Sequence, residues 1–65
     1  MRVSINGLEQ TVRSTTIAAL LEELDHGASH VAVALNHDVV PRARWDQTTI
    51  KAGDEIEIIT PRQGG

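Results

Sequence analysis

The chain has 65 residues, no cysteine, a single aromatic residue (Trp45) and a formal net charge of −3. A chain this short forms one small domain of marginal stability, and without cysteines neither a disulfide framework nor a cysteine-based zinc site can substitute for an aliphatic core. The acidic balance argues against nucleic-acid binding. No apolar stretch approaches the ~20 residues of a membrane span, and the N-terminus lacks a signal-peptide pattern. We therefore expect a cytoplasmic protein.

Two short strands are predicted at the beginning of the chain. Apolar and polar residues alternate over residues 1–5, and this period of two indicates a strand with one buried face. Asn6-Gly7 is the preferred pair for a two-residue hairpin turn with positive φ. Residues 8–13 then form the antiparallel partner, and Gln10 in its middle favours an edge strand.

One helix follows the hairpin. Thr16 is the expected N-cap, because its hydroxyl can accept a hydrogen bond from a free backbone N–H of the first turn. Apolar residues then recur at helical spacing. Gly27 supplies a left-handed stop, which predicts a helix of about eight to ten residues that is stable only when packed on the sheet. The apolar stripe consists of Ile17, Leu20, Leu21 and Leu24. The residues expected to point to water are Glu22, Glu23 and Asp25.

A third strand is predicted over residues 31–35, where large and small side chains alternate. Its large residues are expected to face the helix, so that the opposite face carries only alanine methyl groups. Residues 36–38 form a turn, and Val39-Val40 a short strand. Pro41 ends that strand or places it at an edge, because proline has no N–H to donate.

The last third of the chain is expected to hold a long loop and a final strand. Residues 42–49 are irregular, and Trp45 is predicted to pin this loop to the core by burying most of its ring. Residues 52–54 form a turn. The final strand, over residues 55–60, buries alternate isoleucines.

The predicted fold class is α+β. With one helix and about five short strands, a single helix on one mixed sheet is the economical arrangement, which is a β-grasp fold. We assign residues 1–60 to one β-grasp domain and residues 61–65 to a flexible tail. Glycine has no Cβ, so a tail ending in Gly64-Gly65 can thread a narrow channel and present its terminal carboxylate to the active site of another protein.

Several short motifs follow one another along the domain and end in the tail. The motifs are Ala34-Leu35-Asn36, Val40-Pro41-Arg42, Trp45, Gly53-Asp54, the strand over 55–59 and Gly64-Gly65. In this order and at this spacing they resemble the ubiquitin-like β-grasp sulfur carriers, in particular those of thiamine biosynthesis (the ThiS family). The resemblance covers the whole chain.

The resemblance implies a carrier protein and not an enzyme. An adenylating activating enzyme would use ATP and magnesium to adenylate the carboxylate of Gly65. A sulfur donor such as a cysteine desulfurase would supply persulfide sulfur, and thiazole synthase would consume the resulting thiocarboxylate to build the thiazole ring of thiamine. The carrier itself would bind no cofactor and would be a monomer when alone.

The residues themselves agree with a chain that has no catalytic side chain. We find no Ser/His/acid constellation, no Gly-rich phosphate loop and no paired acids in an evident cleft. His26 and His30 are four residues apart, but Gly27 lies between them and no third ligand has a fixed spacing. We therefore expect no metal site.

Two further groups of residues are predicted to contact partner proteins. The outer face of the sheet, next to the tail, is expected to dock the activating enzyme and the synthase; the alternative is an ordinary half-solvated sheet. The residues of this face are Ala32, Ala34, Glu55, Glu57 and Ile59. Arg62, Gln63 and Gly64 are expected to enter the channel of a partner and contact its walls; the alternative is that Arg62 and Gln63 are solvated spacers.

The amino-acid sequence is also compatible with three other functions. The small subunit of molybdopterin synthase shares the fold and the tail, although that branch usually has a longer chain and a more aromatic last strand. A protein modifier could be conjugated to lysine through Gly65. A plain β-grasp interaction module would have an accidental diglycine.

Overall fold

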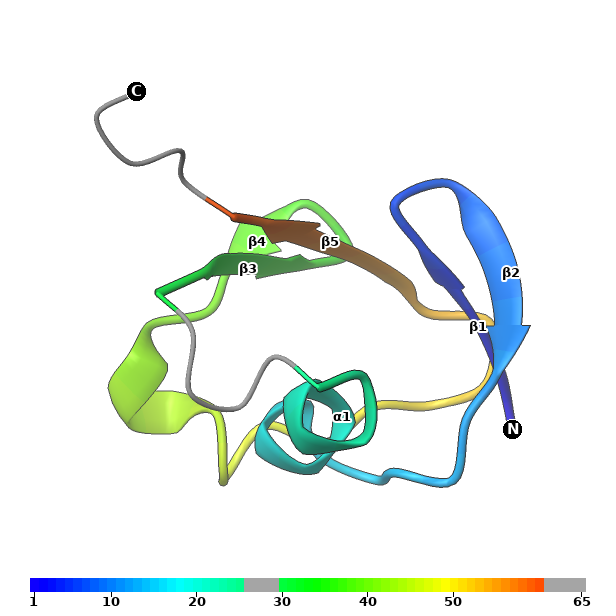
Figure 1. Cartoon of the computed structure of the whole chain (residues 1–65), viewed down its shortest axis with the longest axis horizontal. Coiled ribbons are helices and arrows are strands. Elements are labelled where there is room, and N and C mark those ends of the chain that lie inside the picture. Colours follow the sequence, from blue (N-terminus) through cyan, green and yellow to red (C-terminus); the bar gives the residue numbers. More distant parts are fainter. Residues whose placement is uncertain (26–29, 61–65) are drawn as a thin grey trace.

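The computed structural model describes residues 1–25 and 30–60. Over these residues, five strands form one mixed sheet and one helix, α1 (Ile17–Glu23), packs against one face of it (Figure 1). The strand order is β2-β1-β5-β3-β4, with β5 parallel to β1 and antiparallel to β3. The strands are β1 (Arg2–Ile5), β2 (Leu8–Thr11), β3 (Ala32–Leu35), β4 (Asp38–Val39) and β5 (Glu55–Ile59). The predicted β-grasp arrangement is confirmed, with β2 at an edge.

Two left-handed turns close the two hairpins. Asn6 and Gly7 have φ values of 52° and 86°, as expected for the turn between β1 and β2. Asn36 and His37, with φ values of 50° and 74°, form an equivalent two-residue turn between β3 and β4. The prediction of a three-residue turn was therefore wrong by one position: Asp38 already pairs with Leu35, so β4 begins one residue earlier than expected.

Helix α1 begins as predicted but ends sooner. Thr16 is the N-cap, and its hydroxyl accepts a hydrogen bond from the backbone N–H of Ala19 at 3.1 Å. The helix has seven residues, fewer than expected, with Leu24 as its C-cap. Asp25 takes the left-handed conformation with φ of 68°, which aspartate tolerates better than most residues. The expected stop at Gly27 lies outside the described residues.

A carboxylate on α1 fixes the segment that leads into the helix. Glu23 was expected only to point to water, but it accepts hydrogen bonds from the backbone N–H groups of Arg13 and Ser14 and from the Ser14 hydroxyl. These bonds, that of the Ser14 hydroxyl first, hold the pKa of Glu23 below its ordinary value of 4.5. The side chain thus satisfies backbone donors in the connection between β2 and α1.

The core lies between α1 and the inner face of the sheet. Its buried residues are Val3, Ile5, Val12, Ile17, Leu20, Leu21, Val33, Val40, Trp45, Ile50, Ile56 and Ile58. Trp45 is only 7% exposed, and its indole N–H donates to the carbonyl of Val40 at 2.9 Å. The predicted anchoring role of Trp45 is confirmed. The loop around it is more regular than expected, because Arg42–Arg44 forms a turn of 3₁₀ helix.

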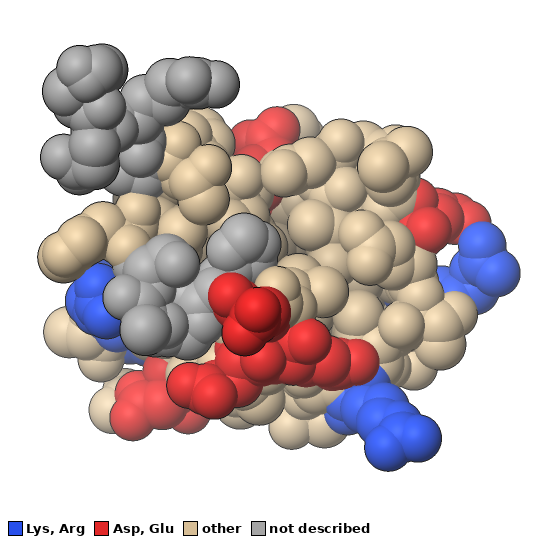
Figure 2. All heavy atoms as spheres, viewed as in Figure 1, with Lys and Arg blue, Asp and Glu red and all other residues tan. Residues whose placement is uncertain are grey.

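On the face of the molecule that Figure 2 shows, Asp and Glu side chains gather over α1. Other carboxylates lie on the sheet, among them Glu55 and Glu57 of β5. Among the residues that the structure describes, no helix has the length and apolar character needed to span a bilayer.

Candidate functional site

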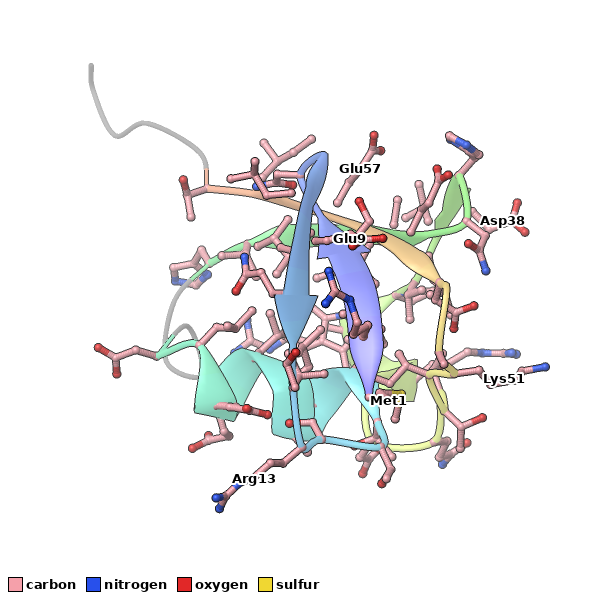
Figure 3. All side chains as sticks on the ribbon, turned by 90° about the vertical axis from the view of Figure 1, so that its right-hand side faces the viewer. Met1, Glu9, Arg13, Asp38, Lys51 and Glu57 are labelled. Atoms are coloured by element: carbon pink, nitrogen blue, oxygen red, sulfur yellow. The ribbon has the colours of Figure 1, made fainter. Side chains whose placement is uncertain are left out.

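The face of the sheet opposite α1 carries the residues expected to dock partners. The pairing of β3 with β5 places Ala32 opposite Ile59 and Ala34 opposite Glu57. Burial alternates along β5, so Glu55, Glu57 and Ile59 point outward together. Figure 3 shows the side chain of Glu57 on the side of the sheet away from α1. The structure therefore brings these five residues onto one face, while their role in docking stays a prediction.

A fourth apolar side chain extends this face. Val39 of β4 lies opposite Ala34 and is 78% exposed. Sequence reasoning missed Val39, because its face depends on the register that the two-residue turn sets between β3 and β4. Ile59 is also well exposed, at 62%. We call the residues Ala32, Ala34, Val39 and Ile59 the outer apolar strip.

The strip has an acidic border. Glu55 and Glu57 are both exposed on the same face of β5. The carboxylate of Glu55 lies 3.3 Å from Nε2 of His37 in the turn before β4. Together with a formal charge of −3 for the whole chain, this border favours a partner whose docking surface is apolar in its middle and basic at its rim.

The beginning of β5 is held by Asn36. Its backbone N–H donates to the carbonyl of Glu55 at 2.7 Å, and its side-chain oxygen accepts from the N–H of Glu55 at 2.9 Å. Its side-chain nitrogen donates to the carboxylate of Asp54 at 3.1 Å. Asp54 in turn accepts from the backbone N–H of Lys51 at 2.7 Å. Asn36 and Asp54, which belong to two of the spaced motifs, thus form one hydrogen-bonded unit that starts the strand.

The opposite end of β5 leads toward the tail. Thr60 is the last residue that the structure describes. The predicted working residues Arg62, Gln63, Gly64 and Gly65 lie outside the described residues, as does the boundary between the domain and its tail. The outer apolar strip reaches Ile59, so it ends next to the point where the chain leaves the sheet.

A groove lies on the other side of the molecule, where α1 meets the 3₁₀ turn. It has a volume of about 360 Å³. It is lined by Thr16, Ala18, Ala19, Leu21, Glu22, Arg42 and Trp45. The guanidinium of Arg42 stands 5.1 Å from the centre of the Trp45 ring, a cation–π arrangement. No sequence pattern indicates this groove, because it forms between segments far apart in the chain.

The two histidines that were considered as metal ligands, His26 and His30, are described only in part. His30 is exposed, whereas His26 is outside the described residues. Within residues 1–25 and 30–60, no group of three or more His, Asp or Glu side chains is placed to hold a metal ion.

Comparison with known families and curated proteins gives consistent matches. The model of the ThiS family matches residues 3–65. The sulfur carrier protein ThiS of Escherichia coli is 36% identical over 56 residues, which cover 86% of this chain and 85% of that protein. A thiazole synthase of Paramagnetospirillum magneticum is 38% identical over 66 residues, which cover all of this chain but only 20% of that relative.

Solved structures agree with these matches. The crystal structure of the thiamine biosynthesis protein ThiS from Geobacter metallireducens superposes with a TM-score of 0.85 at 33% identity, covering both chains completely. A solution structure of a thiamine biosynthesis protein from the same organism gives a TM-score of 0.81 at 35% identity, covering all of this chain and 88% of that one.

Proposed function

The chain belongs to the ThiS family, and from this membership we propose that it is a sulfur carrier protein of thiamine biosynthesis. The observation that carries the proposal is the match to ThiS, over residues 3–65 in sequence and over the whole chain in structure. A second observation supports it: the E. coli relative that is matched over most of its length is named a sulfur carrier protein. The chain would be a substrate of other enzymes and would not itself catalyse a reaction.

The proposed chemistry takes place at Gly65. In an activating enzyme that supplies ATP and magnesium, an oxygen of the Gly65 carboxylate attacks the α-phosphorus of ATP and pyrophosphate leaves. The terminal sulfur of a persulfide, formed by a donor such as a cysteine desulfurase, then attacks the acyl carbon and AMP leaves. A second thiol cleaves the S–S bond of the acyl persulfide, which releases a disulfide and leaves a thiocarboxylate on Gly65.

Elementary chemistry explains why a glycine suits this position. A carboxylate is a poor electrophile, and adenylation converts one of its oxygens into part of a good leaving group. Attack on the acyl carbon is least hindered when the residue has no Cβ, which only glycine provides. Arg62, Gln63 and Gly64 would occupy the narrow channel that leads to the active site of the partner.

The outer apolar strip and its acidic border supply the docking surface in this proposal. The activating enzyme and thiazole synthase would both recognise this face, because it lies next to the residues from which the tail leaves the sheet. The P. magneticum relative supports thiazole synthase as the partner: a region similar to this whole chain occurs within a protein of that name. Exposed contiguous apolar surface is typical of such binding sites.

Intact mass spectrometry tests the proposal. The chain would be incubated with a ThiS-activating enzyme, ATP, magnesium and a persulfide donor. We expect its mass to rise by the difference between one sulfur and one oxygen atom. A variant that lacks both Gly64 and Gly65, and therefore ends in Gln63, serves as the control and should not change. An unchanged mass of the wild-type chain, under conditions that load the E. coli carrier, would refute the proposal.

A further inference from the structure

The turn between β1 and β2 leaves the end of β5 without a strand on one side. β1 pairs with β5 in parallel through Ser4 with Glu55 and Ile5 with Ile56. The backbone N–H of Asn6 continues this ladder to the carbonyl of Ile56 at 2.9 Å. Asn6 then turns the chain away with its φ of 52°, so its main-chain carbonyl cannot serve the next position of the ladder.

The side chain of Asn6 takes the place of the missing strand. Its Oδ1 accepts from the backbone N–H of Ile58 at 2.9 Å, and its Nδ2 donates to the carbonyl of the same residue at 3.1 Å. A carboxamide carries an acceptor and a donor side by side, as a peptide group does. Asparagine also tolerates a left-handed backbone. One residue therefore makes the hairpin turn and extends the β1–β5 ladder.

This contact fixes the part of β5 that leads to the tail. Ile58 pairs with Val33 of β3 on its other side, while its own backbone N–H and carbonyl are both bonded by Asn6 on the side of β1. Ile58 lies two residues before Thr60, the last residue that the structure describes. Without the contact, β5 would be held beyond Ile56 by β3 alone, and the direction in which the chain leaves the sheet would be less well defined.

We propose that Asn6 is a positioning residue for the loading of Gly65: its carboxamide orients the exit of the chain from β5 relative to the outer apolar strip. This proposal rests on the proposed function. When a partner docks on the strip, the tail must enter a channel at a fixed angle. A small misplacement remote from the reacting atoms can cost up to about 100-fold in rate.

Asn36 offers a matched control within the same chain. It occupies an equivalent turn with nearly the same φ, 50° against 52°. Its carboxamide also bonds the backbone of β5, but at Glu55, the end of the strand remote from the tail. Glycine accepts positive φ at no steric cost, so Asn6→Gly and Asn36→Gly both keep the turn. The first removes the two side-chain bonds to Ile58, and the second removes the side-chain bonds to Glu55 and Asp54.

The test compares both variants with the wild-type chain by three measurements. Urea unfolding gives stability, amide hydrogen exchange reports the Ile58 N–H, and steady-state adenylation with a ThiS-activating enzyme gives kcat and KM for the carrier. We expect both variants to lose stability, whereas only Asn6→Gly accelerates exchange at Ile58 and lowers kcat. The loss in kcat should be about tenfold, within the range for misplaced reactants. KM should stay near the wild-type value, because the docking face is intact.

The outcomes separate the two proposals. If the wild-type chain is not adenylated, the proposed function fails and the role of Asn6 fails with it. If the wild-type chain is adenylated and Asn6→Gly shows the same kcat as Asn36→Gly, only the role of Asn6 is refuted. Should Asn6→Gly not fold, Asn6→Asp replaces it: this variant keeps the acceptor for the Ile58 N–H but sets an oxygen against the Ile58 carbonyl. It should also lower kcat, and a wild-type kcat would again refute the positioning role.

Discussion

Replacing Ile59 by aspartate tests the outer apolar strip as a docking surface. Fully burying an isoleucine side chain is worth about 1.5–3 kcal/mol. Ile59 keeps 62% of its surface exposed, so covering the exposed part in a complex is worth about 1–2 kcal/mol on the same scale. A carboxylate in this position would also be desolvated without a partner, which adds to the cost. Since 1.4 kcal/mol corresponds to a factor of ten, we expect Ile59→Asp to weaken binding about tenfold or more.

The assay measures Kd for a ThiS-activating enzyme and for thiazole synthase, for example by titration calorimetry. Leu8→Asp is the matched control: Leu8 is 68% exposed, and the substitution makes the same change in charge. Leu8 pairs with the buried Ile5 across the hairpin, so it belongs to the helix side of the sheet. Unfolding by urea checks that both variants fold. Wild-type affinity of Ile59→Asp for both partners, or an equal loss for Leu8→Asp, would contradict the assignment of this face.

Three further predictions concern stability. Leu20→Ala removes a side chain that is fully buried under the sheet and should cost about 2–5 kcal/mol in urea unfolding; a loss below about 1 kcal/mol would argue against the observed core. Trp45→Phe keeps most of the ring but leaves the carbonyl of Val40 without the indole N–H. We expect the free energy of unfolding to fall by about 1–3 kcal/mol. Thermal unfolding followed by circular dichroism measures Tm, and an unchanged Tm would show that this hydrogen bond is unimportant. Hydrogen bonds, that of the Ser14 hydroxyl foremost, hold the pKa of Glu23 below 4.5 in the folded chain. The ionised Glu23 therefore stabilises the fold at pH values above 4.5, and this contribution is lost as the pH falls through the lowered pKa. Glu23→Gln should therefore flatten the acid side of a stability-against-pH curve, and an unchanged curve would refute this role.

Local sequence patterns determined most of the architecture. The first hairpin followed from Asn6-Gly7, because few other pairs accept two positive φ values in succession. The alternation of β5 followed from the period of two, which assigns Ile56 and Ile58 to one face and Ile59 to the other. Such signals depend only on neighbouring residues, so no tertiary information is needed to read them.

The role of the tail could also be predicted from the sequence. The spaced motifs that end in Gly64-Gly65 resemble the sulfur carriers of the ThiS family, and this resemblance predicts a carrier from the amino-acid sequence alone. What a terminal glycine can do depends on its lack of a Cβ and not on its surroundings in the fold.

Only the tertiary structure decided how distant segments bond to one another. Asn6 contacts Ile58 across 52 positions, and Asn36 contacts Glu55 across 19. Both asparagines could be predicted as turn residues, but the partners of their carboxamides could not, because those partners are set by strand order and register. Val39 joined the outer apolar strip for the same reason. A polar side chain in a turn has many possible backbone partners in an unfolded chain, and the strand order and register of the folded sheet select one of them.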